Sequence, residues 1–202
     1  MDKFGLFFAF YSLILGLSIT ELLGGFAQFV RSHALHKLGA QTALLALFTF
    51  LAITATWIDA FVALRAIDLD VVSLWAPILT STAYYVVAVV VFPARAADFD
   101  HLDDYYVQHK RLVIGLLLAA ELMVNFTFLP MMAEGYRDRH ASFFFYYLPW
   151  HIVEKASYVG AILVRSKRWN IFWLVVLILL MLLDYWNNGA IPQLLDQRYG
   201  TI

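Results

Sequence analysis

Several apolar stretches of this chain carry ionisable side chains near their middle. The residues are Glu21, Asp59, Glu121, His151, Glu154 and Lys155. Carboxylates are expensive in hydrocarbon and normally face the interior of a helix bundle or a wet cavity. Imidazole titrates near neutral pH, and intramembrane carboxylates serve in proton relays and ion pathways. The residue types therefore indicate a site that handles protons or cations within a membrane.

Two of these stretches place polar groups on one helical face. Glu121 and Asn125 are four residues apart, so they can hydrogen-bond each other or share a water. Farther along the chain, four polar residues share a face, with Lys155 one step around the helix. The four are Tyr147, His151, Glu154 and Tyr158. Such a row predicts either a proton relay or an internal ion network that stabilises the bundle.

The elements that must hold these residues are long apolar helices. Hydrophobic residues make up 62% of the chain and charged residues 14%, against roughly 25% charged in soluble domains. Six apolar stretches occur, most of them longer than the roughly 20 residues that cross a bilayer core. They cover residues 4–31, 40–65, 71–92, 111–134, 142–164 and 170–186. The sequence predicts an all-α transmembrane bundle of six spans, forming a single domain over residues 1–202.

The first of these helices has a small or polar residue at every fourth position. The members of this stripe are Ser12, Gly16, Thr20, Gly24 and Gln28. Small residues at this spacing let another helix backbone approach closely inside a membrane. Glu21 lies beside the stripe and has two interpretations. It is either hydrogen-bonded within a tight helix contact, or a proton or cation site of the polar interior.

Two further carboxylates lie toward the ends of their helices. Asp59 shares a small, polar face with Thr56, and Arg65 follows one and a half turns later. A salt bridge to Arg65 near the membrane rim is therefore the alternative to a place for Asp59 in the polar interior. Asp184 stands beside aromatic residues and is interpreted as the interfacial end of the last helix.

Histidine and aspartate concentrate in two connections that are expected on the same side of the membrane. The candidate metal ligands are His33, His36, His101, Asp103, Asp104 and His109. These groups suit Zn, Mn or Fe, although no ligand spacing such as H-E-x-x-H occurs. A solvated amphipathic rim helix with tyrosine anchors explains the same residues. No cofactor is predicted, and a metal at these residues or a haem at His151 stays an alternative. The absence of cysteine excludes thiolate chemistry.

The two halves of the chain show a weak internal similarity. At an offset of 100 residues, Leu17 aligns with Leu117 and Glu21 with Glu121. Three helices followed by three helices would make this an inverted repeat, the arrangement that places substrate sites at mid-membrane in many transporters. Because most of the matches are common apolar residues, chance explains them as well.

Orientation follows from the positive charge of the connections, since Lys and Arg stay cytoplasmic. One side carries Arg31, Lys37, Arg95, Lys110, Arg111, Arg165, Lys167 and Arg168. The other side, with both termini, carries Lys3, Arg65, Arg137, Arg139 and Arg198. This imbalance predicts both termini in the periplasm. A net charge of -1 without a basic cluster argues against nucleic acid, so the expected partners are the lipid bilayer and a second copy or another membrane subunit.

Five short segments resemble a family of small uncharacterised bacterial inner-membrane proteins. The segments are Phe7–Ser12, Thr20–Gly25, Phe92–Pro93, Leu102–Tyr106 and His109–Arg111. They cover the first, third and fourth helices and their connections. The resemblance implies a bacterial cytoplasmic membrane and six helices, and it brings no known activity.

Three hypotheses of function follow from these residues. The first is a conduit or transporter for protons, ions or small solutes, lined by the buried carboxylates and His151. The second is a structural or regulatory membrane subunit that associates through the stripe on the first helix. The third is a metal- or haem-dependent membrane enzyme. The sequence favours transport, because charges lie on at least four spans and no connection is long enough for a soluble domain.

Overall fold

The chain is helical throughout the part that the structure describes. The computed structural model describes residues 3–63, 71–94, 99–137 and 148–187. Its helices are α1 (Lys3–Arg31), α2 (Ala40–Ala63), α3 (Val71–Val91), α4 (Leu102–Arg137), α6 (Leu148–Leu163) and α7 (Lys167–Asn187), with a 3₁₀ turn η1 (Leu35–Lys37). Among the described residues, α1, α2 and α7 are long and apolar enough to cross a membrane, and α3 contains a shorter apolar stretch. The all-helical prediction is confirmed over these residues.

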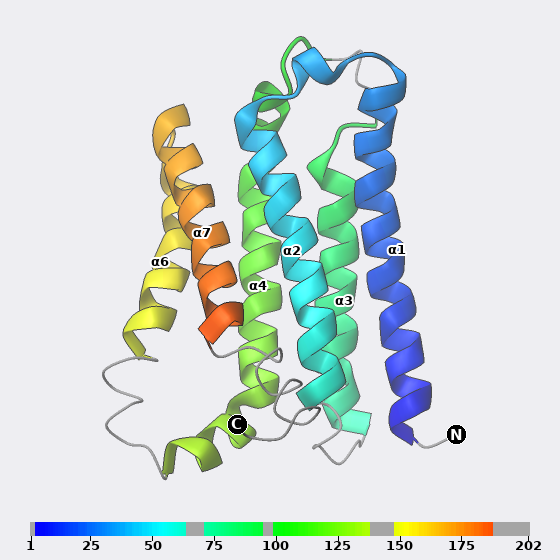
Figure 1. Ribbon diagram of the computed structural model, residues 1–202, viewed down its shortest axis with the longest axis vertical. Helices are drawn as coiled ribbons and strands as arrows, with labels where there is room; N and C mark the ends of the chain where they lie inside the picture. Colours follow the sequence, from blue (N-terminus) through cyan, green and yellow to red (C-terminus); the bar gives the residue numbers. More distant parts are fainter. Residues whose placement is uncertain (1–2, 64–70, 95–98, 138–147, 188–202) are drawn as a thin grey trace.

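The helices run side by side, with α1 at one edge and the α6–α7 pair at the other (Figure 1). Helix α3 packs between α1 and α4, while α2 packs against α4 and α7. One face of α1 is buried at intervals of three, four or seven residues, at Phe7, Tyr11, Leu15, Ser18, Leu22 and Phe29. This periodic face fixes which side of α1 turns toward the bundle.

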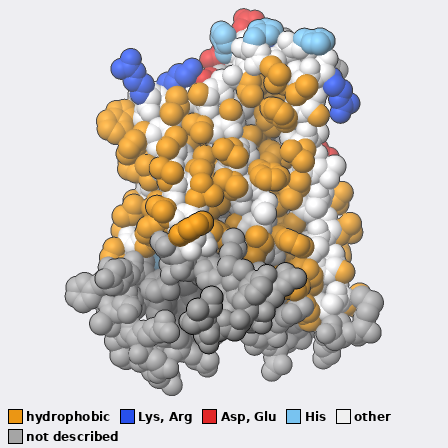
Figure 2. Space-filling view, in the orientation of Figure 1, with side chains coloured by type: hydrophobic (Ala, Val, Ile, Leu, Met, Phe, Trp, Pro, Cys, Tyr) orange, Lys and Arg blue, Asp and Glu red, His pale blue; other side chains and the backbone are white. Residues whose placement is uncertain are grey.

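Charged and apolar side chains separate along the long axis of the molecule. Figure 2 shows Lys, Arg and His side chains gathered at one end, above a broad band of hydrophobic side chains. At this basic end α1, α3 and α6 finish and α2, α4 and α7 begin. Large apolar side chains such as Leu17, Val89 and Leu179 are exposed in the band. A continuous outward apolar surface of this kind suits hydrocarbon rather than water.

A tight turn at the basic end lets α2 return alongside α1. His33 adopts a left-handed conformation, with a φ of 55°. Its N–H donates to the Val30 carbonyl at 3.2 Å, and the Ala34 N–H donates to the Phe29 carbonyl at 3.0 Å. This hydrogen-bond pattern ends many helices and is usually built around glycine. A histidine there carries local backbone strain.

Helix α4 begins earlier than the apolar stretch 111–134 indicates. It starts at Leu102, and two aspartates in its first turn lie where negative charge is favourable. The buried side chains Leu102, Tyr106, Lys110 and Val113 continue the inward face of α4 in steps of four, four and three. The expected rim helix is therefore the first part of α4 itself. The predicted helical residues 64–65 and 142–147, Arg65 and Tyr147 among them, lie outside the described residues.

Candidate functional site

A polar cavity lies among five helices, α2, α3, α4, α6 and α7. Its volume is about 190 Å³. The polar side chains that line it include Thr56, Asp59, Tyr84, Glu121, Asn125, His151, Glu154, Asp184 and Tyr185. It occupies the half of the bundle in which α2 and α7 end and α6 begins, away from the basic end. Four carboxyl groups, each from a different helix, therefore share one cavity.

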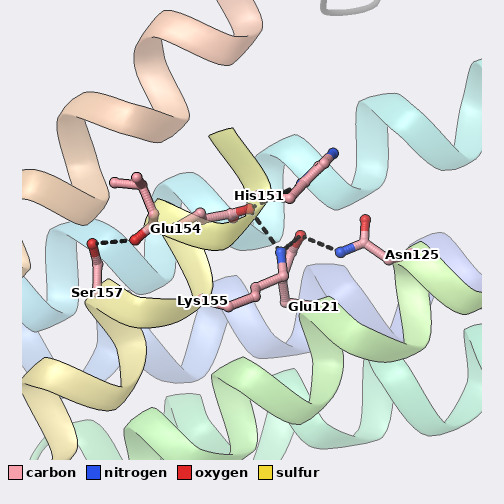
Figure 3. Close-up of polar contacts among 7 residues, drawn as sticks. Glu121, Asn125, His151, Glu154, Lys155 and Ser157 are labelled. Carbon is pink, nitrogen blue, oxygen red and sulfur yellow. Dashed lines mark hydrogen bonds and ion pairs between the residues drawn. The ribbon is translucent and has the colours of Figure 1, made fainter. Parts of the chain in front are cut away.

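Lys155 bridges two of these carboxylates. Its Nζ lies 3.0 Å from Glu121 Oε1 and 2.7 Å from Glu154 Oε2. Asn125 Nδ2 donates to the same Glu121 oxygen at 3.1 Å, and His151 Nδ1 lies 3.4 Å from Glu154 Oε2. Figure 3 shows these groups converging between α4 and α6. Of the two arrangements expected for Glu121 and Asn125, the direct hydrogen bond is present, and an ion network joins α4 to α6.

Hydroxyl groups hold the other side of the cavity. Tyr185 OH donates to Asp59 Oδ2 at 2.6 Å, which joins α7 to α2. Thr56 Oγ1 donates to Tyr84 OH at 3.0 Å, which joins α2 to α3. The alternative partner of Asp59, Arg65, lies outside the described residues. Asp59 thus faces the interior and is held there by a tyrosine.

An apolar layer separates the cavity from the basic end. Tyr158 is buried in this layer, and its ring packs edge-on against Phe48 with a centroid distance of 5.7 Å. The same core cluster contains the buried side chains Ile114, Leu117, Ala161, Leu174 and Leu177. Among the described residues, none of these apolar side chains lines the cavity, and the hydroxyls of Thr49 and Ser157, next to the two rings in sequence, are buried as well.

A second polar cluster ties three helices together at the basic end. Lys110 Nζ donates to the Ala161 carbonyl at 3.2 Å, to Asn170 Oδ1 at 3.1 Å and also to the Val164 carbonyl. Tyr106 OH donates to the same Asn170 oxygen at 3.1 Å. Positive charge is favourable at the carbonyl end of a helix, here that of α6. Three oxygen acceptors therefore surround the Lys110 ammonium group. We call this cluster the lysine clasp.

Glu21 lies outside the polar cavity, so its predicted place in the polar interior is corrected. Its side chain is exposed, one helical step from the buried Leu22, and no residue of α1 lines the cavity. Most faces of α1 carry apolar side chains, so the sequence pattern did not show which face turns toward the bundle. Glu21 and Glu121, which an inverted repeat would make equivalent, occupy unlike environments.

The centre of the small-residue stripe on α1 points away from the bundle. Gly16, Thr20 and Gly24 are exposed. A methyl group added at either glycine would meet no atom of the described residues within 4 Å. The two ends of the stripe are used within the chain, because Ser12 accepts a hydrogen bond from α2 and Gln28 donates one to the backbone after α3. The close helix contact expected at the centre is therefore not made within the described chain.

The candidate metal ligands at the basic end are engaged in separate contacts. The six residues are His33, His36, His101, Asp103, Asp104 and His109. Asp103 forms an ion pair with Lys167 at 2.6 Å, and the His109 ring stacks on Tyr105. His36 Nδ1 lies 3.2 Å from the His33 carbonyl oxygen, and His101 and Asp104 are exposed. Among residues 3–63, 71–94, 99–137 and 148–187, no group of three or more His, Asp or Glu could hold a metal ion.

Sequence reasoning missed several groups that build the site. Tyr185 and Asp184 line the cavity, although Asp184 was interpreted as a helix end. Asp59 and Tyr185 lie at nearly the same distance from the starts of α2 and α7, and this equal depth is the signal that pairs them. Lys110 counted only as a topological charge, and its partner Asn170 was not singled out.

Comparison with protein-family models, with curated proteins and with solved structures gives no match.

Proposed function

We propose that the chain is a six-span protein of a bacterial cytoplasmic membrane with its basic end in the cytoplasm. Three apolar helices of membrane-spanning length support this proposal, together with the apolar stretch of α3 and the length of α4. Apart from Lys155, the Lys and Arg side chains that the structure describes lie at one end of the hydrophobic band (Figure 2), as the positive-inside rule expects of a cytoplasmic end. In this orientation the polar cavity lies in the periplasmic half, and both termini are periplasmic.

We propose further that the protein moves protons or small cations by way of this cavity. The observation that carries the proposal is the excess of negative groups, since four carboxyl groups accompany one ammonium and one imidazole. An arrangement of this kind in a membrane attracts cations or takes up protons and disfavours anions.

The Lys155 ammonium is the internal cation that an incoming proton or cation would displace. Its single positive charge is shared between Glu121 and Glu154, so the three groups together keep one net negative charge. A proton or cation that reaches either carboxylate competes with the ammonium for it. Lys155 is then free to turn toward the other carboxylate, so arrival of the charge is coupled to a side-chain movement between α4 and α6.

The apolar layer between the cavity and the lysine clasp makes a carrier more suitable than an open pore. From Glu121 to Lys110 the axis of α4 rises about 16 Å. Buried apolar side chains such as Leu117 and Ile114 occupy this interval. A cation that crosses the membrane must therefore await a rearrangement that opens this layer, and the expected kinetics are those of a saturable carrier.

The test is flux into liposomes that contain the purified protein, under imposed pH and voltage gradients. We expect the wild type to move protons or cations and Glu121→Gln and Glu154→Gln to abolish the flux. Glu21→Gln is the matched control, because this carboxylate lies in the same membrane band but outside the cavity. Absence of flux from folded wild type, or an equal loss in the control, would overturn the proposal.

The second candidate function is a membrane subunit that associates through α1. The observation that favours it is the outward face formed by Gly16, Thr20 and Gly24 with Glu21 beside it. Because the chain has no cysteine, Gly24→Cys gives a single thiol on this face and Leu179→Cys an exposed control on α7. Disulfide-linked dimers from the first variant alone would support the subunit role. Equal linkage from both variants would contradict it.

A further inference from the structure

A second cavity, entirely apart from the polar one, opens between α1 and α2 near the basic end. Its volume is about 230 Å³. The lining is apolar, with Leu22, Leu23, Phe26, Leu38, Ala43, Ala46, Leu47, Phe50 and Phe92. Leu23, Phe26 and Leu47 are each more than 40% exposed, so the groove opens sideways at the surface of the hydrophobic band. We call it the apolar groove.

The groove forms because α1 packs more closely on α3 than on α2. Gly25 allows the close approach, since a Cβ built there would lie 2.8 Å from Cδ2 of Phe92. The Phe92 ring, tilted against Phe29, forms the floor of the groove. On the side of α2, Ala43 and Ala46 leave the space that larger side chains would fill.

The size and chemistry of the groove suit a hydrocarbon chain. An engineered apolar cavity of about 150 Å³ is large enough for benzene, so this larger groove accommodates a run of methylene groups. Its open side faces the surface that suits hydrocarbon, and an acyl chain can enter it without crossing a polar layer. Among the described residues no polar side chain lines the groove, so a headgroup would be recognised at its end.

That end is basic. Leu38 lines the groove and directly follows Lys37. Phe26 lies five residues before Arg31, a rise of about 7.5 Å along α1. His33 and His36 are exposed in the same turn. Lys37 Nζ donates to the Phe99 carbonyl at 3.0 Å, which anchors its ammonium group at this rim. The nearest end of the groove thus offers positive charge at the depth of lipid phosphates.

We propose that the apolar groove holds one acyl chain of an anionic phospholipid whose phosphate lies at Arg31 and Lys37. The proposal rests on the membrane orientation given above only for its assignment to the cytoplasmic leaflet. Gly16, Thr20 and Gly24 do not line the groove. A bound lipid would fill the wedge between α1 and α2 and fix the tilt of α1 on the bundle.

The test is lipid retention measured by native mass spectrometry on detergent-purified protein titrated with phosphatidylglycerol or phosphatidylcholine. Near a membrane surface each Lys or Arg favours an anionic lipid by a factor of about five, so two predict a preference of about 5- to 30-fold. Ala46→Trp fills the groove and is expected to abolish retention of both lipids. The paired change Arg31→Gln with Lys37→Gln is expected to remove the preference for phosphatidylglycerol.

The matched control is Arg165→Gln with Arg168→Gln, which removes two exposed positive charges at the same end but away from the groove. Equal retention of the two lipids by the wild type would overturn the proposal, and so would an equal loss of preference in the control. Unchanged retention in a folded Ala46→Trp variant, with fewer dimers, would assign the groove to a second copy instead. If Ala46→Trp does not fold, the two charge variants decide. The readout is lipid binding and not flux, so it stands whether or not the protein carries ions.

Discussion

Replacing Lys155 with methionine removes the ammonium group that lies between two carboxylates. Met keeps most of the length and apolar volume of the side chain, so packing changes little. The change eliminates two ion pairs, at 3.0 Å to Glu121 and at 2.7 Å to Glu154. Breaking a buried ion pair by removing one partner typically costs about 3–5 kcal/mol, because the remaining charge is left uncompensated. The three side chains are 20–23% exposed, so we reduce the expected loss to about 2–4 kcal/mol.

The assay is reversible unfolding of the purified protein in mixed detergent micelles, followed by the loss of helical circular dichroism. Lys155→Met combined with Glu121→Gln removes one of the two uncompensated charges. It should recover part of the lost free energy of unfolding, and the double-mutant cycle should give a coupling of about 0.5–3 kcal/mol. Arg168→Met, an exposed change on α7, is the control and should stay within about 0.5 kcal/mol of wild type. The reasoning is refuted if Lys155→Met is as stable as this control, or if the double variant is less stable than the single one.

Three further changes give separate tests. Gly25→Ala should destabilise the protein by about 1–3 kcal/mol in the same assay, because the new methyl group collides with Phe92. Gly16→Ala, whose methyl group meets no neighbour, should leave the stability unchanged. Equal losses in the two variants would show that α1 and α3 do not pack closely at Gly25. Tyr185→Phe should cost about 1.5–3 kcal/mol through the lost 2.6 Å hydrogen bond to a carboxylate, and a neutral result would contradict that contact. His33→Gly should raise stability by up to about 1 kcal/mol, since glycine adopts the left-handed conformation without strain, and lower stability would indicate that the imidazole makes a necessary contact.

The sequence predicted the first three helices well because hydrophobic length decides them, whereas α4 begins nine residues before the apolar stretch that predicted it. The expected stretches 4–31, 40–65 and 71–92 agree with α1, α2 and α3 to within two residues at each end that the structure describes. The Glu121–Asn125 hydrogen bond was also predictable, since both residues lie on one helix and need no knowledge of packing. Local spacing is therefore a sufficient guide within a single helix.

Contacts between helices were not predictable in the same way. Lipid-facing and buried faces are both apolar in a membrane protein, so the pattern around Glu21 did not reveal that this residue points outward. Tyr185 and Asp59 are 126 positions apart, and only the antiparallel path of the intervening helices brings them to one depth. Lys110 looked like a surface charge because it precedes an apolar stretch. Lys110 is buried because its ammonium group meets the carbonyl end of α6, and the sequence does not predict that α6 ends at this position.

The lysine clasp also determines which parts of the protein can move independently. Its ammonium group holds α4, the end of α6 and the start of α7 at one point, so these three helices are joined at the basic end. Helix α1 makes no contribution to this point and packs mainly on α3. Under the carrier proposal we expect α4, α6 and α7 to move as one body hinged at the basic end, so that the layer opens on the side of α2, where Phe48 packs on Tyr158. Glu121 lies about 16 Å along α4 from the clasp, and Glu154 and Asp184 are likewise removed from it along α6 and α7, so a small rotation would displace these carboxylates more than the layer that lies nearer the clasp.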